Sequence, residues 1–324
     1  MPTLTPLEIR SRLINLEMDL RKVIIVTPVH NRSEETFQCL KSLGRAEKSG
    51  LDVHIIVVDD GSTDGTSEII KREFPEVEIL QGDGSLWYTA GTNRGIEAAL
   101  RHNPEYVLAI NNDSVFDENC VTYLVECAES HPNSVVGALL LNWETPHKVF
   151  QVSPKWDLWR GGVRHWHNQT VWTVPDKPWA VELIVGNCVL YPVEAIRRVG
   201  LMDEKRLVQY GDAEYTPRIR RKGWNLLIEP RARVFCKPND TITGFRSLPL
   251  SEKLRESFFR SAGPYSLKRR LYMNLAAAPN RLQGLAALPI FYVRVLLGMN
   301  PEGKWATDQD EKTLKEVFSK SIVP

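Results

Sequence analysis

Short β-branched runs alternate with longer amphipathic segments over the first half of the chain. Short apolar runs predict buried strands, and apolar residues at helical spacing predict helices. The predicted strands cover residues 23–27, 53–58, 77–80, 106–110 and 135–141. Between them, a first helix is predicted over 33–46 with Ser33 as its cap, and a second ends at Lys71 and is capped by Ser62 or Asp64. Two further helices are predicted over 89–102 and 118–130. This order predicts a parallel, doubly wound α/β sheet that binds ligands at the carboxyl ends of its strands.

The regular alternation stops at Asn142. Residues 142–178 are rich in Trp, Pro and Gly, and structure is predicted to resume with a strand over 181–191 and helices over 192–199 and 212–222. The Trp side chains either pack an irregular lobe or offer flat apolar faces to a sugar. They are Trp143, Trp156, Trp159, Trp166, Trp172 and Trp179.

Length and composition limit the alternatives. A chain of 324 residues suggests one large domain with an appendage. We divide it into an N-terminal helical extension (1–21), a main domain (22–240) and a basic amphipathic helical region (241–324). The formal net charge of +1 gives no reason to expect a nucleic-acid partner. The start of the chain does not resemble a signal peptide, and no run of about 20 apolar residues predicts a membrane span.

The five cysteines are scattered and lack CxxC spacing. This pattern predicts reduced thiols in a cytoplasmic compartment, not a disulfide framework or a structural zinc site.

Three acidic clusters are predicted to lie where strands end: Asp59-Asp60-Gly61-Ser62, Asn111-Asn112-Asp113 and Gly211-Asp212-Ala213-Glu214. Any one of them could be simple turn or cap chemistry. Three clusters at one sheet edge would repel each other, and so they predict a divalent cation and a ligand rich in hydrogen-bond donors.

Two stretches resemble family-2 glycosyltransferases with the GT-A fold. One runs from Val26-Thr27-Pro28 through Asp59-Asp60-Gly61-Ser62, and the other is Tyr210-Gly211-Asp212-Ala213-Glu214-Tyr215 with the preceding 199–204. The resemblance covers about residues 22–240. It implies a GT-A-type, mostly parallel sheet with a helical C-terminal appendage, and transfer of a sugar from a nucleotide-sugar donor.

The resemblance also implies a donor site. Thr27, Pro28, Asn31 and Arg32 would line the nucleotide pocket, and Asp59 or Asp60 would accept a hydrogen bond from the base or ribose. Gly91, Asn93 and Arg94 would approach the diphosphate or sugar near a helix N-terminus. The resemblance also implies that Asn112 binds the donor. It implies that Trp87, Gly186 and Asn187 either contact the acceptor or support the residues that do.

The segment Asn111-Asn112-Asp113 stands where the family has an Asp-x-Asp metal motif, and only the last carboxylate is present. Asp113 can still ligate Mn²⁺ or Mg²⁺, because the diphosphate and water supply most of the oxygen ligands. Cys236 lies near the position of a metal-binding His in many relatives. We do not count it as a ligand, because a thiol suits a hard cation poorly.

Asp212 and Glu214 are the candidates for the catalytic base. Two residues apart on a helix they point about 200° apart, so only one can face the acceptor. By the resemblance Asp212 falls on the family's catalytic Asp, whereas Glu214 has the spacing of an i,i+4 ion pair with Arg218. One base, one metal and no evident nucleophile predict a single displacement with inversion.

The C-terminal region is basic and apolar from Arg246 to Arg294. A surface helix on an anionic membrane, at the cytoplasmic face, and a helical cap with a solvated basic face both fit this pattern. Its basic residues are Arg246, Lys253, Arg255, Arg260, Lys268, Arg269, Arg270, Arg281 and Arg294. The membrane interpretation predicts that neutralising Lys268, Arg269 and Arg270 releases the protein from vesicles without unfolding it.

The donor nucleotide (UDP, dTDP or GDP) is open at this point. Residues 82–95 resemble rhamnosyltransferases of surface polysaccharide synthesis, which implies a glycan or lipid-linked acceptor. A sugar-phosphate nucleotidyltransferase is one alternative, although the basic Gly-rich loop that it needs after the first strand is missing. A non-catalytic binding module is the other, and the presence of both Asp113 and Asp212 speaks against it.

Overall fold

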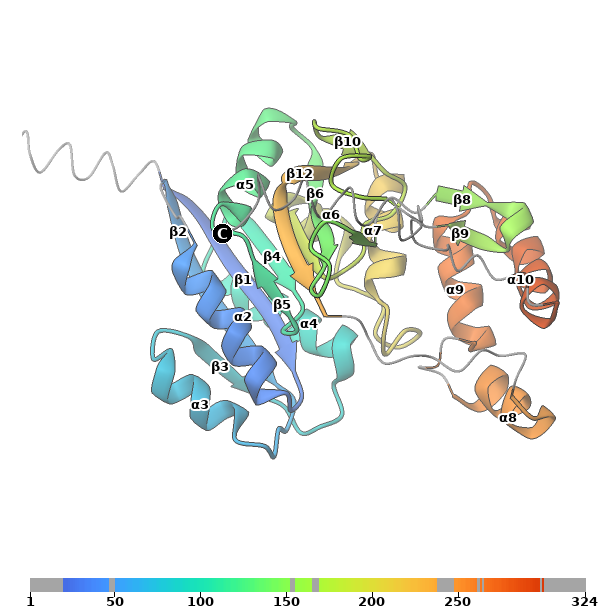
Figure 1. Cartoon of the computed structure of the whole chain (residues 1–324), viewed down its shortest axis with the longest axis horizontal. Helices are drawn as coiled ribbons and strands as arrows, with labels where there is room; N and C mark the ends of the chain where they lie inside the picture. Colours follow the sequence, from blue (N-terminus) through green and yellow to red (C-terminus); the bar gives the residue numbers. More distant parts are fainter. Residues whose placement is uncertain are drawn as a thin grey trace, which may run out of the picture.

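The computed structural model describes residues 20–46, 50–151, 155–164, 169–237, 248–260, 263, 265–297 and 299. Of the predicted extension 1–21, only its last two residues belong to this set, and residues 301–324 lie outside it. Figure 1 shows a large sheet flanked by helices, with a group of helices at one end.

A ten-stranded mixed sheet forms the centre of the described chain, in the order β10-β12-β6-β11-β4-β1-β2-β3, with β5 beside β12 and β7 beside β6. Strands β1, β2, β3, β4, β6 and β12 run in one direction and the others run against them, so the sheet is mostly parallel. The strands are β1 Arg21–Val29, β2 Leu51–Asp59, β3 Glu78–Gln81, β4 Tyr106–Ile110, β5 Ser114–Phe116, β6 Ser134–Asn142, β7 Val149–Gln151, β10 Trp179–Ala180, β11 Cys188–Pro192 and β12 Asn225–Cys236.

Alternate residues of the central strands pack into two apolar layers, because successive strand side chains point to opposite faces. In β1, Ile24 and Val26 join the layer under α4, α6 and α7, whereas Val23 and Ile25 join the layer under α2 and α5. Helix α3 packs beside α2. The helices are α2 Ser33–Arg45, α3 Thr66–Glu73, α4 Trp87–Arg101, α5 Cys120–Ser130, α6 Val193–Val199 and α7 Asp212–Arg221. The predicted α/β architecture with a mostly parallel sheet is confirmed.

The predicted strand over 181–191 is wrong in its first part. Only Cys188–Pro192 is a strand there, and it runs antiparallel to β4 and β6. Residues 181–187 leave the sheet, so that Gly186 can reach the start of α7: its N–H donates to Asp212 Oδ2 at 2.8 Å. An apolar run alone did not distinguish this loop from a strand.

Strands β5 and β12 had no counterpart in the sequence prediction. The apolar pattern of β12 is broken in the middle by Glu229, Pro230 and Arg231, where its register with β6 shifts. The carboxylate of Glu229 is fully buried and receives the Arg231 guanidinium at 3.0 Å. A bulge of this kind hides a strand from a periodicity argument.

The predicted cap at Ser33 is also wrong. Arg32, with φ 63°, is the residue before α2, and its own side chain makes no cap hydrogen bond. Instead the Ser33 N–H donates to Asp64 Oδ2 at 2.9 Å, and the Thr66 N–H donates to Asp64 Oδ1 at 3.2 Å. Asp64, one of the two caps predicted for α3, therefore serves the starts of both helices.

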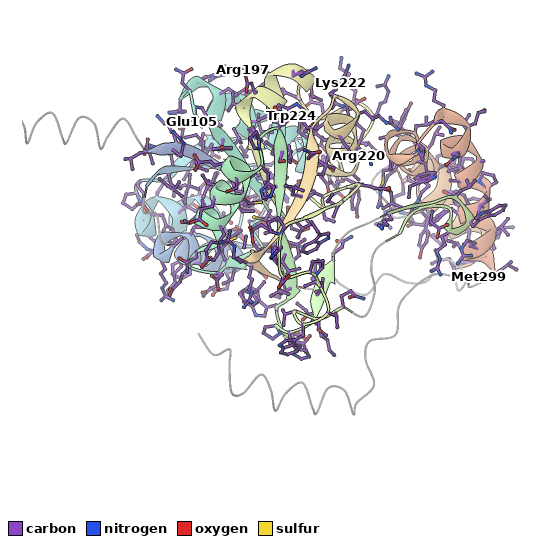
Figure 2. All side chains as sticks on the ribbon, turned by 90° about the horizontal axis from the view of Figure 1, so that it is seen from above. Glu105, Arg197, Arg220, Lys222, Trp224 and Met299 are labelled. Atoms are coloured by element: carbon purple, nitrogen blue, oxygen red, sulfur yellow. The ribbon has the colours of Figure 1, made fainter. Side chains whose placement is uncertain are left out.

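The C-terminal helices pack on the sheet domain through α9, which lies against α7. These elements are α8 Leu250–Leu254, the π-helical turn η3 Arg255–Phe259, α9 Leu267–Ala277 and α10 Arg281–Leu296. In Figure 2 they occupy one end of the molecule, with Met299 far from Glu105. No helix in the described part of the chain is both long and apolar enough to cross a bilayer.

Part of the Trp-rich segment folds against these helices as a hairpin of β8 (Lys155–Asp157), the turn η1 (Leu158–Arg160) and β9 (Gly162–Arg164). Gly161 has φ +79°, and a Cβ there would lie 2.5 Å from the Phe291 Cα, so the hairpin touches α10 closely. Trp156 Nε1 donates to Gln283 at 3.0 Å, whereas Trp159 is 77% exposed. Trp166 lies outside the described residues.

Candidate active site

The loops after β1 and β2 are joined by hydrogen bonds at the carboxyl edge of the sheet. The Asn31 N–H donates to Ser62 Oγ at 2.7 Å, and Asn31 Oδ1 accepts the Thr63 N–H at 2.9 Å. Asn31 and Arg32 both take the left-handed conformation, with φ 59° and 63°. This geometry turns Arg32 across the edge of the sheet, where its Nη1 reaches Asp113 Oδ2 at 2.8 Å.

Thr27, one of the predicted pocket residues, is buried in β1. Its Oγ1 is buried and finds no hydrogen-bond partner among the residues that the structure describes. Pro28 follows it and packs against α4, because a Cβ on Gly91 would lie 2.8 Å from the Pro28 Cβ. Gly91 thus allows α4 to approach β1 closely, and its predicted contact with a diphosphate stays a prediction.

Asp59 and Asp60 are both buried at the end of β2. Asp59 accepts the Ser62 N–H at 2.9 Å and contacts the Ser67 hydroxyl. Asp60 accepts three N–H groups, those of Gly84, Leu86 and Trp87, at 2.8, 3.0 and 3.0 Å. Asp60 therefore holds the loop that leads into α4. Asp59 accepts fewer hydrogen bonds from the protein than Asp60 does, so it is the better placed of the two to accept one from a nucleobase.

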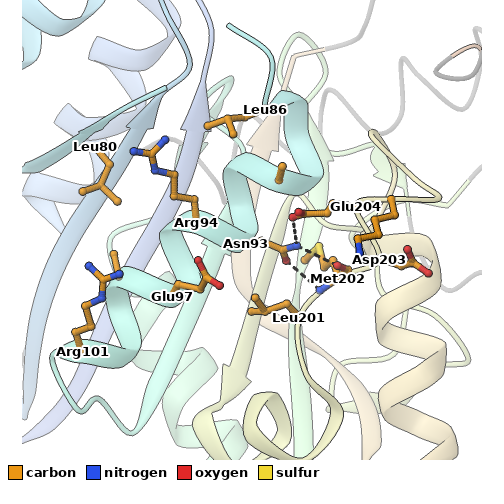
Figure 3. Close-up of a pocket in the computed structure, with 13 residues that line it drawn as sticks. Leu80, Leu86, Asn93, Arg94, Glu97, Arg101, Leu201, Met202, Asp203 and Glu204 are labelled. Carbon is orange, nitrogen blue, oxygen red and sulfur yellow. Dashed lines mark hydrogen bonds between the residues drawn. The ribbon is translucent and has the colours of Figure 1, made fainter. Parts of the chain in front are cut away.

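The predicted donor residues Asn93 and Arg94 contact the loop before α7. Asn93 is buried, donates to the Met202 carbonyl at 3.0 Å and to Glu204 at 2.8 Å, and accepts the Met202 N–H at 3.0 Å (Figure 3). The exposed Arg94 lines a pocket of about 610 Å³ between α4 and this loop. Both residues therefore lie beside the loop 201–205. Their binding of the donor remains a prediction.

Asp113 follows β4 and is the carboxylate predicted to ligate a metal. Its side chain is 14% exposed and forms an ion pair with Arg32, whose side chain is 53% exposed. Burial raises the pKa of Asp113, and the positive charge of Arg32 opposes that rise. Asn112, predicted on the donor side, donates to Thr36 Oγ1 of α2 at 2.9 Å.

Asp212 is the first residue of α7 and is 8% exposed. Burial raises its pKa, whereas the Gly186 N–H and the charge of Arg269 oppose the rise. Gly186 has no room for a side chain: a Cβ would lie 2.3 Å from Tyr88 Oη and 2.8 Å from the Asp212 Cβ. Tyr88 Oη donates to the Gly186 carbonyl at 3.3 Å. Asp212 is thus a buried carboxylate held by a fixed loop, with its proton affinity raised.

Glu214 has a different role from Asp212. Its carboxylate receives Arg218 Nε at 2.7 Å and Nη2 at 3.1 Å, as the i,i+4 spacing predicts. Arg218 also donates to the carbonyl oxygens of Val199 and Leu201 at 2.8 and 2.7 Å. The pair therefore fixes the loop between α6 and α7 to the face of α7.

A chain of hydrogen bonds connects the Asp113 segment with the Asp212 segment. The Asn111 N–H donates to the Asn187 carbonyl at 3.1 Å, and the neighbouring Gly186 N–H holds Asp212. Asn187 Nδ2 also contacts Cys236 Sγ at 3.7 Å. The loop 186–187 therefore binds Asp212 through Gly186 and contacts the segment that leads to Asp113 through the backbone of Asn111.

Metal binding by the protein alone finds little support in the described residues, where no group of three His, Cys, Asp or Glu side chains could hold an ion. Asp113 supplies one buried carboxylate whose present partner is a cation. This donor fits a divalent ion that is shared with a diphosphate, which brings its own oxygen atoms. Cys236 is buried with its thiol against Ser114 and Asn187, and burial raises its pKa to about 12. All five cysteines are free thiols.

Two residues near Asp212 were not predicted as part of the site. Tyr88 contacts Gly186, and Arg269 of α9 acts electrostatically on Asp212. The sequence shows Arg269 only as one of a basic run, Lys268-Arg269-Arg270, which fits both a membrane-facing helix and the solvated face of a helical cap. Only the fold reveals that α9 lies on α7.

Comparison with known proteins agrees with this geometry. Residues 24–174 match the model of Glycosyl transferase family 2. The succinoglycan biosynthesis protein ExoA of Rhizobium meliloti is 25% identical over 302 residues, covering 90% of this chain and 84% of that protein. The N-acetylglucosaminyl-diphospho-decaprenol L-rhamnosyltransferase of Mycobacterium tuberculosis is 26% identical over 240 residues, covering 67% of this chain and 75% of that protein.

Solved structures show the same fold at low sequence identity. The mannosyltransferase PcManGT of Pyrobaculum calidifontis, in complex with GDP-Man and Mn²⁺, has a TM-score of 0.52 and 16% identity, covering 97% of this chain and 88% of that one. GalNAc-T7 with UDP, GalNAc and Mn²⁺ has a TM-score of 0.57 and 14% identity, covering 78% of this chain and 51% of that one. The chain is similar to glycosyltransferase family 2 over residues 24–174 and has a GT-A-like fold. Its activity is sugar transfer from a nucleotide-sugar donor.

Proposed function

We propose that the protein is an inverting, metal-assisted glycosyltransferase that extends a lipid-linked or growing surface glycan. The observation that carries this proposal is that the loop 186–187 links Asp212 with the segment 111–113, which ends in Asp113. One carboxylate stands in the segment that pairs with a cation, and the other is buried with a raised pKa. A metal partner and a general base are the two groups that a single displacement requires.

In this proposal Asp212 removes the proton from the attacking hydroxyl of the acceptor. Burial raises its pKa and therefore makes it a stronger base than an exposed Asp. The Gly186 N–H keeps one carboxylate oxygen in place, so the base does not rotate between turnovers. Attack from the acceptor side, opposite the leaving nucleotide, inverts the anomeric carbon.

The donor would bind at the other side of the loop. Arg32 can form an ion pair with the diphosphate as it leaves, because its guanidinium is half exposed and lies beside Asp113. Asp113 and the diphosphate would together hold a Mn²⁺ or Mg²⁺ ion, which stabilises negative charge on the leaving group when bound. Asp59 remains the candidate for the base or ribose, and Asn31 shapes the loop that covers it.

A panel of UDP-, dTDP- and GDP-sugars tests the proposal. We expect one nucleotide class to raise the melting temperature, and to do so more strongly with Mn²⁺, because a ligand at about 100 times its Kd stabilises a protein by about 2.7 kcal/mol. The same donor should release nucleoside diphosphate on incubation with the enzyme. Release of pyrophosphate from a nucleoside triphosphate would instead favour the nucleotidyltransferase alternative. Binding with no turnover of any donor and acceptor would indicate a binding module.

The acceptor is proposed to meet the enzyme at a membrane surface, and the structure changes which residues would make that contact. Of the basic residues expected there, Arg269 is buried, Arg255 and Arg260 pair with Glu252 and Glu256, and Arg246 lies outside the described residues. The stronger feature is apolar: several large side chains on α8, η3 and α10 are exposed. They are Leu250, Leu254, Phe258, Phe259, Leu282, Leu285, Val293, Leu296 and Leu297.

This distribution predicts that vesicle binding depends on apolar insertion more than on charge. Phe258 and Phe259 are 65% and 83% exposed, so replacing both by Ser should leave the melting temperature unchanged and abolish co-sedimentation with phosphatidylglycerol vesicles. Arg255→Gln, on the same turn, is the charge control and should reduce binding only modestly and only at low salt. Retention of vesicle binding by the double Phe variant would contradict the membrane contact at η3. Of Lys268, Arg269 and Arg270, only Lys268 is exposed, since Arg269 is buried and Arg270 is partly buried. The triple neutralisation is therefore a poor probe of the membrane contact, and the Phe258 and Phe259 variant takes its place.

A further inference from the structure

Helix α9 is fixed beside the helix that begins with Asp212. Arg221, in the last turn of α7, donates from Nη2 to the carbonyl oxygens of Leu275 and Ala278 at 2.8 and 2.6 Å. Arg206, in the loop before α7, lies with its guanidinium carbon 5.4 Å from the centre of the Tyr272 ring. The first turn of α9 is thereby held next to the first turn of α7, where the proposed base lies.

Arg269, in that first turn of α9, is 8% exposed. Its guanidinium carbon lies 3.4 Å from the ring centre of Tyr210, which precedes Asp212 by two residues. Nη1 donates to the Gly263 carbonyl at 3.0 Å, but Nε is buried and has no acceptor among the described residues. The stack on Tyr210 fixes the plane of a guanidinium that is only partly satisfied.

Arg270 is the next residue and has the same unsatisfied character. Its guanidinium carbon lies 3.8 Å from the ring centre of Phe291, and its Nε is buried without an acceptor in the described part of the chain. Burial, followed by repulsion from Arg269, lowers the pKa of Arg270 to about 10. Within the same part of the chain, neither Arg269 nor Arg270 forms a salt bridge with a carboxylate.

Arg269 is buried and Arg270 is partly buried, and neither is in a salt bridge in the described part of the chain, although the charge of Asp212 acts on Arg269. Such a pair is unfavourable, because burial removes water that stabilises each charge and leaves their mutual repulsion. Ionisable groups that burial perturbs in this way cluster at functional sites, where a ligand can supply the opposite charge. A guanidinium matches phosphate oxygens particularly well, because its N–H groups form a planar fork. Arg32, which is proposed above to bind the leaving diphosphate, contacts Asp113 in the donor half of the site.

We propose that Arg269 and Arg270 form a subsite for the diphosphate of the acceptor, whose hydroxyl Asp212 activates. This inference rests on the proposed function, since it names the part of a lipid-linked acceptor that the C-terminal region recognises. It assigns one group of cations to each diphosphate, with Arg32 for the leaving donor and the α9 pair for the acceptor. The appendage thereby completes the acceptor half of the active site.

The test uses the full chain and geranyl diphosphate as the probe, with geraniol and inorganic pyrophosphate as comparisons. Binding is measured by calorimetry without membranes. We expect Arg269→Met and Arg270→Met each to weaken geranyl diphosphate binding on the order of 10- to 100-fold. Lys268→Met is the matched control, since Lys268 is exposed on the same turn and should bind the probe as the wild type does. Geraniol should not bind measurably to any variant.

A purely structural role for these arginines predicts a different outcome. Met preserves the apolar stem, so the Arg→Met variants should keep or raise the melting temperature if the buried charge serves a ligand. Loss of stability with unchanged probe binding would overturn the proposal, and so would equal loss of binding in Lys268→Met. Dependence of phosphatidylglycerol vesicle binding, but not of geranyl diphosphate binding, on Arg269 would assign the pair to lipid headgroups and also overturn it.

The nucleotide arm separates this inference from the proposed function. Both Arg→Met variants should bind the nucleoside diphosphate with Mn²⁺ as the wild type does, because the donor half of the site is untouched. Suppose that the wild-type chain binds nucleotide and turns over a donor, but Arg269→Met binds geranyl diphosphate as tightly as the wild type does. In that case the acceptor subsite is wrong and the proposed function stands. If no nucleotide binds at all, the proposed function itself fails.

Discussion

Asp212→Asn is expected to lower the transfer rate by about 10²–10⁴-fold and to leave nucleoside diphosphate binding close to that of the wild type. The amide has the same shape and can still accept the Gly186 N–H, so the loop 186–187 should keep its position. What the variant loses is the ability to take a proton from the acceptor. Steady-state transfer assays, together with calorimetric titration of the nucleotide, measure the two quantities separately.

Glu214→Gln is the control for Asp212→Asn. Its carboxylate is bound on both oxygens by Arg218, so the variant should lose part of an ion pair that fixes the loop before α7. We expect a lower melting temperature with a rate near the wild-type value. An inactive Glu214→Gln beside an active Asp212→Asn would reverse the assignment of the base.

The pH profile gives a second check on Asp212. The base acts in its charged form, and burial raises its pKa. The wild-type rate should therefore fall as the pH drops through this raised pKa, at a higher pH than for an exposed Asp. In Asp212→Asn the residual rate should lack this acidic limb. An unchanged limb in the variant would mean that another group titrates.

The carboxylates could be located from the sequence because each one follows directly on a sheet or helix signal. Asp59 and Asp113 stand at or just after the ends of buried strands, and Asp212 stands at the start of a helix, so topology alone brings them to one edge of the sheet. The i,i+4 spacing of Glu214 and Arg218 likewise gave the ion pair that the structure contains. These inferences depend on local periodicity and on parallel strand order, both of which are visible in a sequence.

Other features depend on contacts between distant segments and left no such signal. The turn that brings Gly186 to Asp212 resembles a continuation of β11, because its apolar residues satisfy a strand pattern. Asn93 looks like a polar residue near a helix start, yet its amide is used by Met202 and Glu204, more than a hundred residues further along the chain. The burial of Arg269 against Tyr210 depends on how α9 docks, which charge patterning cannot reveal.

Removing the metal partner is the other change from which we expect a large effect. Asp113→Ala should weaken nucleoside diphosphate binding by on the order of 10- to 100-fold in Mn²⁺, and by much less in chelator, because the carboxylate acts through the ion that it shares with the diphosphate. In wild-type enzyme, excess chelator should abolish transfer. Isothermal titration with and without Mn²⁺ measures the binding difference.

Arg32→Ala separates the metal role of Asp113 from its ion pair. In the structure Arg32 is the cation that Asp113 contacts, so a bound metal ion and Arg32 compete for one buried carboxylate. Removing Arg32 should weaken nucleoside diphosphate binding but keep its dependence on Mn²⁺, while removing Asp113 should destroy that dependence. If wild-type transfer persists in excess chelator and Arg32→Ala is the inactive variant, the guanidinium and not a metal ion stabilises the leaving diphosphate.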